Sequence, residues 1–336
     1  MLTKPLQSQG LFSCQAVEIS VRISYSEVQM KKKNRLALTS FAALSLFSVF
    51  FVLSCASNHA VISADLYEER EESLYIPPQS EIKWQEIEGA EWAKYFFYEN
   101  KGYPVRYHCV KINLSAENLS IITFPQSEKD FTQKNGKATN YFTGLRAGKF
   151  SKKFNSIITM NTAPFGGKNG SWDTLAKLGS TRRICGVHIV EKKELAPPLA
   201  RYSALCFYKE EKGFSGKIIK SQTKEALAGC DYAFGGFFAI LTEGEKEAFS
   251  WRSNDSRSAA GLSQDGKTLY LLVVEGERWS KSHGLSYPEC ADIMLALGAR
   301  NAMEMDGGGS SSLFINQKNM LAYPALRKNA VFLGFN

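Results

Sequence analysis

The feature that most constrains the fold is a succession of short segments rich in β-branched and aromatic residues, separated by turn-forming residues. Several of them alternate between apolar and polar residues, which is typical of a strand with one buried face. The chain has 336 residues, 44% of them hydrophobic, and from Trp84 onward it contains no fixed-period repeat. These observations exclude a coiled coil, a collagen-like chain or a disordered protein, and they favour one domain over residues 84–336. The predicted strands cover residues 105–114, 119–124, 156–160, 184–190, 204–208, 237–241, 259–262, 268–275, 302–306, 312–315 and 330–335.

Two helices are predicted, one over residues 140–154 and a stronger one that begins at Ser286. Ser286 and Glu289 have the spacing of a capping box, and Gly298 supplies a stop signal at the other end. With the runs at 268–275 and 302–306, this second helix forms a β-α-β unit. We therefore predict an α+β domain with a large mixed, mostly antiparallel sheet, few helices and one β-α-β unit near 268–306.

Both strands of this unit end in a carboxylate followed by glycine, Glu275–Gly276 and Asp306–Gly307. If the strands are parallel, both acids lie at the same edge of the sheet, where α/β proteins bind ligands. Neighbouring strands are about 4.8 Å apart. One or two such spacings cover the separations of roughly 5 to 9.5 Å that paired acids need in glycoside hydrolysis. Glu275 and Asp306 are therefore candidate catalytic carboxylates.

The loop after Asp306 contains Gly307, Gly308, Gly309 and Ser310. Glycines allow positive φ and close approach of the backbone to a ligand, and successive N–H groups can form an anion-binding concavity. The alternative is a merely flexible loop. An acid fixed at the strand end favours a binding function.

Three other segments carry candidate site residues. Arg257 lies among small residues, which leaves space for its guanidinium to bind a phosphate or a carboxylate, although a surface salt bridge fits the same pattern. Gly235–Gly236 directly precedes one predicted strand, and Asn161 directly follows another. Either of these could be only a turn packed by aromatic residues.

The N-terminal region has the pattern of an export signal. Basic residues at 31–35 precede an uncharged apolar run from Leu36 to Leu53, and Met30 lies where such a signal would begin. The run ends in Ser54–Cys55, which resembles a bacterial lipobox with Cys55 as the lipidated residue. An uncleaved membrane anchor is the alternative. We interpret 1–29 as an upstream misreading of the start, 30–54 as the signal peptide and 55–83 as a polar tether.

The net charge of +8 does not indicate a nucleic-acid partner. Loss of residues 1–54 removes six basic and two acidic residues and leaves +4 on the mature chain, too little for a nucleic-acid footprint. The four histidines are scattered and no CxxC pair occurs, so we predict no metal site. Five cysteines follow Cys55, which allows at most two disulfides, and buried free thiols are the alternative.

Taken together, the motifs resemble the phosphodiester glycosidase family, which includes the lysosomal enzyme that uncovers mannose 6-phosphate by removing N-acetylglucosamine. The resemblance extends over residues 95–336 and is densest from 256 to 312. The chain departs from the family pattern where it has Thr162–Pro164 and where Glu275 replaces the usual aspartate. The matching elements, in chain order, are Asn161 with Phe165, Gly235–Gly236, Arg257 with Gly261, Glu275–Gly276, Gly284–Ser286 and Asp306 to Ser310.

The resemblance implies a hydrolase of the cell envelope that cleaves a sugar from a phosphodiester-linked or related anionic glycoconjugate, and it connects the chain loosely with exopolysaccharide metabolism. We expect Asp306 and Glu275 to divide the two carboxylate roles and Asn161 to orient the sugar or the attacking water. We expect Arg257, with Gly307 to Ser310, to hold the phosphate. No cofactor is required, although the carboxylates leave room for a divalent cation. The alternative functions are a glycan-binding surface lipoprotein without activity and a glycosidase for neutral polysaccharide.

Overall fold

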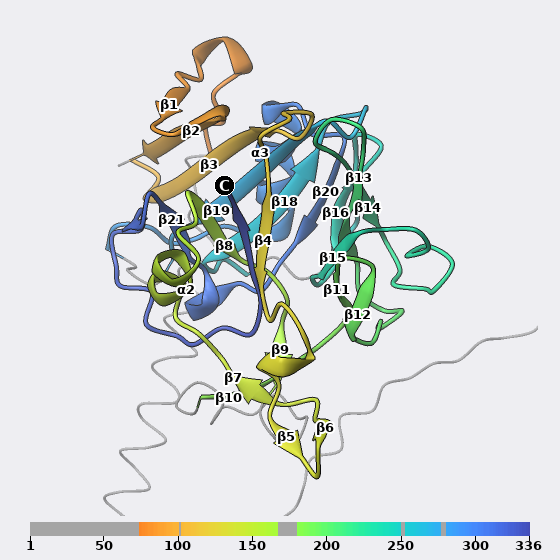
Figure 1. The fold of residues 1–336 in the computed structure, drawn as a ribbon. Helices are drawn as coiled ribbons and strands as arrows, with labels where there is room; N and C mark the ends of the chain where they lie inside the picture. Colours follow the sequence, from red (N-terminus) through yellow and green to blue (C-terminus); the bar gives the residue numbers. More distant parts are fainter. Residues whose placement is uncertain (1–73, 101, 167–179, 250–252, 277–279) are drawn as a thin grey trace, which may run out of the picture. The chain divides into compact units, whose positions relative to one another are not determined.

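An eight-stranded antiparallel sheet organises the part of the chain that the structure describes (Figure 1). The structure is a computed structural model, and it describes residues 74–100, 102–166, 180–249, 253–276 and 280–336. These residues belong to a unit that begins at Glu72. The predicted misread start, the signal peptide and Cys55 lie outside the described residues. No helix among the described residues is long and apolar enough to cross a lipid bilayer.

The large sheet has the strand order β1-β2-β3-β19-β18-β20-β16-β17, and every pair in it is antiparallel. Strands β19 and β20 both pair with β18 and therefore run in the same direction, with helix α3 between them in the chain. The predicted β-α-β unit is thus present, with one strand inserted between its two strands. The strands are β1 (Gln85–Ile87), β2 (Ala90–Asn100), β3 (Val105–Asn113), β16 (Ala239–Thr242), β17 (Glu245–Lys246), β18 (Arg257–Leu262), β19 (Thr268–Val274) and β20 (Asn301–Glu304).

Two five-stranded antiparallel sheets and two smaller ones complete the fold. The first five-stranded sheet has the order β22-β21-β8-β23-β4 and the second β12-β11-β15-β13-β14, and the smaller ones are β7-β10-β9 and β5-β6. Their strands are β4 (Ile121–Phe124), β5 (Gln133–Lys134), β6 (Lys137–Ala138), β7 (Phe142–Thr143), β8 (Ile158–Asn161), β9 (Phe165–Gly166), β10 (Thr181–Ile184), β11 (His188–Val190), β12 (Lys193–Ala196), β13 (Ala204–Lys209), β14 (Phe214–Ile219), β15 (Tyr232–Gly235), β21 (Leu313–Ile315), β22 (Lys318–Asn319) and β23 (Phe332–Phe335).

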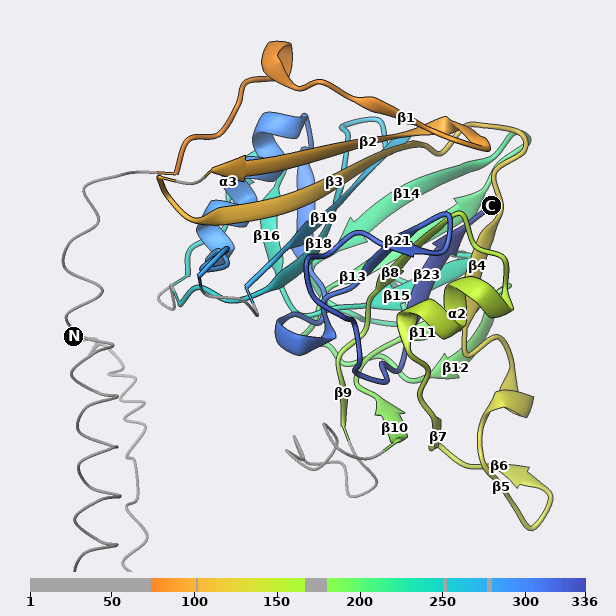
Figure 2. The same cartoon turned by 90° about the vertical axis from the view of Figure 1, so that its left-hand side faces the viewer.

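The described helices are few, and each packs on a sheet. Helix α3 (Tyr287–Leu297) has the predicted Ser286 capping box and ends at Gly298, which takes the left-handed conformation. It contacts β16 to β20 on one face of the large sheet (Figure 2). Helix α2 (Ala147–Lys153) packs on β8 and β21. The short 3-10 helices are η1 (Gln79–Glu81), η2 (Glu128–Asp130) and η4 (Gly308–Ser310).

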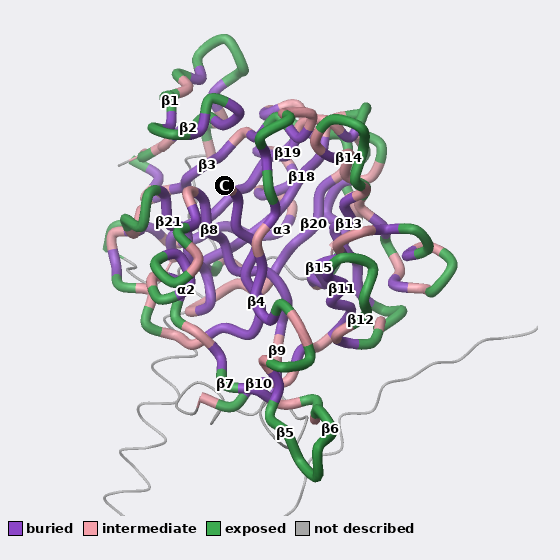
Figure 3. The backbone as a smooth tube through the Cα atoms, viewed as in Figure 1, coloured by how far each residue is buried: buried purple, intermediate pink, exposed green. Residues whose placement is uncertain are grey.

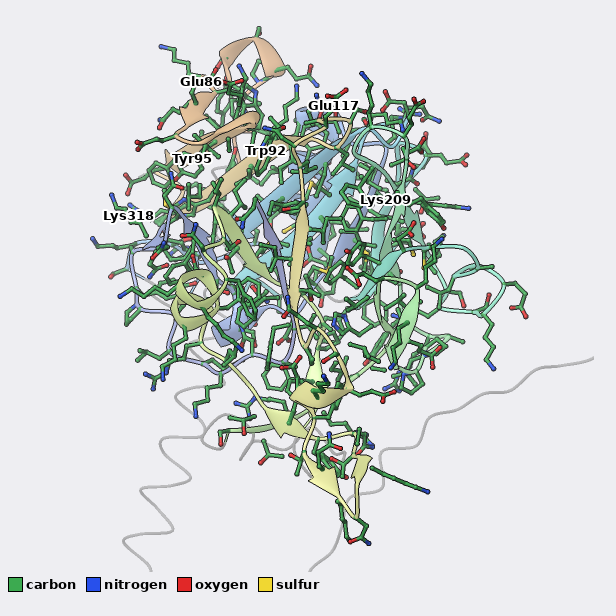
Figure 4. All side chains as sticks on the ribbon, in the orientation of Figure 1. Glu86, Trp92, Tyr95, Glu117, Lys209 and Lys318 are labelled. Atoms are coloured by element: carbon green, nitrogen blue, oxygen red, sulfur yellow. The ribbon has the colours of Figure 1, made fainter. Side chains whose placement is uncertain are left out.

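The hydrophobic core has two main layers, one on each face of the large sheet. The first lies between α3 and the large sheet and contains Leu272, Val274 and Met294. The second lies between the large sheet and the two five-stranded sheets. Figure 3 shows the central strands as buried and the hairpin β5-β6 as exposed. Strand β2 also contributes, since Trp92, which is labelled in Figure 4, packs against Phe335 with ring centroids 6.3 Å apart.

Some local predictions were wrong. The helix predicted over residues 140–154 begins only at Ala147, because Phe142 and Thr143 pair with β10 instead. The run predicted as one strand at 184–190 is divided between β10 and β11, with Gly186 at a positive φ of 103° between them. Strand β2 was not predicted, although it is eleven residues long.

Candidate active site

The register of the large sheet brings three predicted site segments to one edge. Arg257 pairs with Val274, and Ala259 pairs with Glu304 on the other side of β18. Glu275 and Asp306 therefore leave the sheet at the same edge, on either side of the chain that enters β18. Their strands are two spacings apart, or about 10 Å.

Asp306 is half-buried, and the positive charges of Arg327 and Arg182 act on its carboxyl group. Burial raises its pKa to about 7, and the negative charge of Asp255 acts in the same direction. A hydrogen bond from Ser310 and the positive charges of Arg327 and Arg182 oppose this rise. A carboxyl group with such a pKa can donate a proton near neutral pH.

The glycine loop after Asp306 is shaped by close contacts. A Cβ atom at position 307 would lie 2.7 Å from the Ser256 carbonyl oxygen, and one at 309 would lie 2.5 Å from the Arg327 guanidinium. Gly308 takes a positive φ of 57°, and its amide donates to Ser256 O at 2.8 Å. Within the described residues, the amides of Gly307 and Gly309 donate to no protein group. The loop therefore offers two amides beside the Asp306 carboxyl group.

Two arginines near Asp306 and its glycine loop were not predicted as site residues. Arg327 donates from Nη1 to Ser310 Oγ at 2.9 Å, so it is fixed against the glycine loop. Arg182 is fully buried, donates from Nε to Lys328 O, and lies over the Phe165 ring at 4.7 Å. Burial and the nearby charge of Arg327 lower the pKa of Arg182, while Asp306 acts in the opposite direction. Two guanidinium groups placed together in this way favour an anionic ligand.

The sequence carried little signal for these two arginines. Each is one of a basic pair, Arg182–Arg183 and Arg327–Lys328, in segments that resemble ordinary surface. Their approach to Asp306 depends on β10 and on the segment between β22 and β23, which are distant in the chain. No local pattern indicates that approach.

Asn161 lies at the end of β8 and connects three segments of the site. Its Nδ2 donates to Asp306 O at 2.5 Å. Its Oδ1 accepts from the Ser312 amide at 2.9 Å and from Ser258 Oγ at 3.0 Å. The side chain is 1% exposed. Asn161 thus fixes the backbone at Asp306, and its amide group is already occupied by protein partners.

Gly235 and Gly236 lie where the chain leaves β15 toward β16. Their amides donate to the carbonyl oxygens of Val187 and Ser203, at 2.9 and 3.0 Å. A Cβ at Gly236 would lie 2.4 Å from Met303 Cε and 2.5 Å from Glu304 O. Close packing against β20 explains glycine here.

Glu275 lies in a closed polar cluster. Its Oε1 is 2.8 Å from His108 Nε2 and accepts from Arg106 Nε at 3.3 Å, while Oε2 accepts from the Ala322 amide at 3.2 Å. Tyr95 on β2, which is labelled in Figure 4, has its hydroxyl oxygen 2.8 Å from Nδ1 of His108 on β3. Burial would raise the pKa of Glu275, but the hydrogen bond to His108 and the charge of Arg106 hold it below its ordinary value.

Arg257 points to the other face of the large sheet. Its Nε donates to Leu285 O at 2.8 Å, its Nη2 donates to Ser253 O at 2.7 Å, and the guanidinium lies 4.3 Å from the centre of the Tyr287 ring on α3. The next residue, Ser258, turns to the opposite face and contacts Asn161. Adjacent strand residues alternate in this way. The structure therefore brings Asn161, Asp306 and Ser310 together, and the Arg257 and Glu275 side chains lie in separate surroundings.

A small cavity of about 180 Å³ lies where β10 ends, with Ile184 in its lining. It is mainly apolar, and Cys185 contributes to its lining. The charge of Asp306 also acts on Cys185, whose pKa is raised mainly by burial. No cluster of three or more potential metal-binding side chains occurs in the described ranges.

Comparisons with known proteins agree with the sequence resemblance. Residues 166–335 match the model of a family described as phosphodiester glycosidase. No curated protein matches the chain. A solved hypothetical protein from Synechocystis is similar in fold, with a TM-score of 0.54 and 14% identity, over 77% of this chain. This chain covers only 64% of that protein's length.

A second solved structure is the zebrafish N-acetylglucosamine-1-phosphodiester alpha-N-acetylglucosaminidase catalytic domain, auto-inhibited by its pro-peptide. It has a TM-score of 0.51 and 13% identity, over 75% of this chain and 87% of the zebrafish chain. At such identities the structural likeness shows the fold. The family match includes Glu275, Asp306 and both site arginines, and it extends over half of the sequence. The chain belongs to the phosphodiester glycosidase family.

Proposed function

We propose that this protein is a cell-envelope hydrolase that releases a sugar from a phosphodiester-linked or related anionic glycoconjugate. The single observation that carries the proposal is Asp306, with a pKa raised to about 7, beside Arg182, Arg327 and the glycine loop. Family membership supports the reaction type. The envelope location rests on the N-terminal export pattern, with Cys55 as the predicted lipid attachment.

In this proposal Asp306 is the general acid. Its raised pKa keeps the carboxyl group protonated up to about neutral pH. It gives its proton to the oxygen that leaves the anomeric carbon of the sugar with the phosphate. General acid catalysis of this kind contributes roughly a hundredfold to ten-thousandfold to the rate.

The phosphoryl oxygens would be held by Arg327, Arg182 and the amides of Gly307 and Gly309. Charge develops on these oxygens as the bond to the sugar breaks, and fixed donors stabilise it without having to rearrange. The contact of Arg327 Nη1 with Ser310 Oγ and the burial of Arg182 support such fixed positions. No metal ion or cofactor is invoked.

The other predicted residues have positioning roles in this proposal. Asn161 holds the backbone of Asp306 through its amide group. Gly236 allows the close packing of β20, and Gly235 allows the close approach of Val187. The assignments of phosphate binding to Arg257 and of the second carboxylate role to Glu275 stay predictions.

The reaction is tested with a synthetic sugar-1-phosphodiester in water enriched in oxygen-18. Cleavage at the anomeric carbon puts the heavy oxygen in the sugar and leaves the phosphomonoester unlabelled, which we expect by mass spectrometry. A labelled phosphomonoester would indicate attack at phosphorus and would contradict a glycosidase. The phosphate oxygens are the better readout, because a free reducing sugar exchanges its anomeric oxygen with water.

A glycan-binding protein without activity is the second candidate. The observation that favours it is the Asn161 amide, whose oxygen and nitrogen are both occupied by protein partners. Binding of the phosphodiester by calorimetry, with no product after prolonged incubation, would support this candidate. Turnover that Asp306→Asn abolishes would exclude it.

A further inference from the structure

A carboxylate that the sequence did not indicate lies beside Asp306. Asp255 precedes β18 and is exposed. Its backbone is fixed by two hydrogen bonds with Leu285, at 3.2 and 3.0 Å. Its Oδ1 accepts from the Ser256 amide at 2.8 Å, so the side chain is also oriented.

The glycine loop packs directly against this carboxylate. A Cβ at Gly308 would lie 3.6 and 3.8 Å from the two Asp255 carboxylate oxygens, and the Gly308 amide donates to the carbonyl of the next residue, Ser256. Asp255 and Asp306 therefore flank one short loop. The charge of Asp255 is also among the influences that raise the pKa of Asp306.

Asp255 is better placed for chemistry than Glu275. Glu275 is 1% exposed, and both of its carboxylate oxygens have protein partners. Asp255 is exposed and forms no ion pair with any side chain of the described ranges. Because Asp255 is exposed, solvent water can reach its carboxylate.

We infer that Asp255 is the second catalytic carboxylate, and that it takes a proton from the water that attacks the sugar. The inference rests on the proposed function. The water oxygen bonds to the anomeric carbon while the bond from that carbon to the phosphate oxygen breaks. The electron pair of the broken bond goes to that oxygen, which receives the proton of Asp306, and Asp255 receives the proton of the water. Such a single displacement inverts the configuration at the anomeric carbon.

The decisive experiment compares Asp255→Ala with and without sodium azide. Azide attacks without needing a base, so it replaces both the water and the missing carboxylate. We expect Asp255→Ala to lower kcat by at least about a hundredfold, azide to restore at least about a tenth of it, and the product to be a glycosyl azide. Asp292→Ala is the matched control, because Asp292 is also an accessible aspartate but lies on α3 in a surface ion pair with Lys246. It should keep wild-type kcat.

Asp255→Asn guards against misfolding, since its amide oxygen can still accept from the Ser256 amide but cannot take a proton. It should melt like the wild type and lose the same activity. The inference fails if Asp255→Asn turns over within threefold of the wild type, if azide yields no glycosyl azide, or if the first-formed sugar retains its configuration by proton NMR. A wild-type protein with no turnover on any sugar-1-phosphodiester would instead refute the proposed function, and this inference with it.

Discussion

Two acids leave the large sheet at one edge, and their surroundings are opposite. Asp306 is half-buried beside two arginines and a loop with two amides that donate to no described protein group, and its pKa is raised. Glu275 is sealed by His108, Arg106 and the Ala322 amide, and its pKa is lowered. Both follow a buried strand and precede a glycine. The comparison teaches that position at a strand end brings an acid to the site, whereas segments distant in the chain decide what it can do there.

Substitution of Asp306 should have the largest effect and tests the difference between the two acids most directly. We expect Asp306→Asn to lower kcat on a sugar-1-phosphodiester by about a thousandfold, because the amide cannot donate an acidic proton. Binding should persist, since the arginines and the loop amides remain. Phosphomonoester release, followed by phosphorus NMR, measures the loss.

Asp292→Asn is the control for that variant, as a surface substitution of the same type. It should leave kcat unchanged. Full activity of Asp306→Asn would show that the raised pKa of Asp306 has no catalytic use.

The next largest effect should come from Arg327. Replacement by glutamine removes a positive charge from the phosphate position, so we expect kcat/KM to fall by about ten to a hundredfold, an effect of 1.4 to 2.8 kcal/mol at 1.4 kcal/mol per tenfold. Arg300→Gln is the matched control, because Arg300 lies near the start of β20 and donates to Glu243 O and Gln264. If the two variants lose the same activity, Arg327 does not bind the substrate.

Substitution of Glu275 should lower the stability of the protein more than its turnover. Glu275→Gln removes the charge that faces His108 and Arg106, and we expect the free energy of unfolding to fall by about 1 to 3 kcal/mol, while kcat changes less than tenfold. Because the folded-state pKa is lowered, the stabilisation is present above the ordinary pKa of glutamate and is lost as pH falls through the folded value. Urea unfolding at several pH values tests this.

Wild type and Glu275→Gln should therefore differ in stability at pH 7 and converge in acid. A thousandfold loss of kcat in a variant that unfolds like the wild type would instead support the sequence prediction that Glu275 is the second catalytic carboxylate.

Much of the fold could be predicted from the sequence because the sequence patterns that indicate it are local. The β-rich run of β3, the capping box at Ser286 and Gly298 each act within a few residues, and the structure has the strand, the cap and the helix end, although β3 is buried on both faces. Strand β2 was missed because its run, Ala90–Asn100, mixes charged and aromatic residues without clean alternation. Its partner β3 and the core on both faces make it a strand.

The candidate site could be predicted from the sequence only in part, because only some of its residues belong to one local motif. Asp306 and its glycine loop form one continuous motif, and the family resemblance indicated Asn161 as a further site residue. Arg182, Arg327 and Asp255 reach the site through β10, the segment between β22 and β23, and the bridge to Leu285. Which face Arg257 occupies depends on strand register, since a shift of one residue would exchange it with Ser258.

The smallest expected effect is a shift in pH dependence, and it separates the influences on Asp306. Activity requires the protonated acid, so kcat/KM should fall above about pH 7, the raised pKa of this group. Arg327 acts against that rise. In Arg327→Gln the residual activity should therefore persist to higher pH, with the basic limb shifted upward by less than one unit.

Asp255 acts in the same direction as burial and raises the pKa of Asp306. The residual activity of Asp255→Asn should therefore decline at lower pH than the activity of the wild type. Rate profiles between pH 5 and 9 test both signs. Limbs that stay in place, or that move in the same direction in the two variants, would show that the group titrating near pH 7 is not Asp306. Buried Glu304 also has a pKa raised to about 7, and it is the first alternative if the limbs stay in place, because it lies on the α3 face beside Arg257, where neither substitution changes a neighbouring charge.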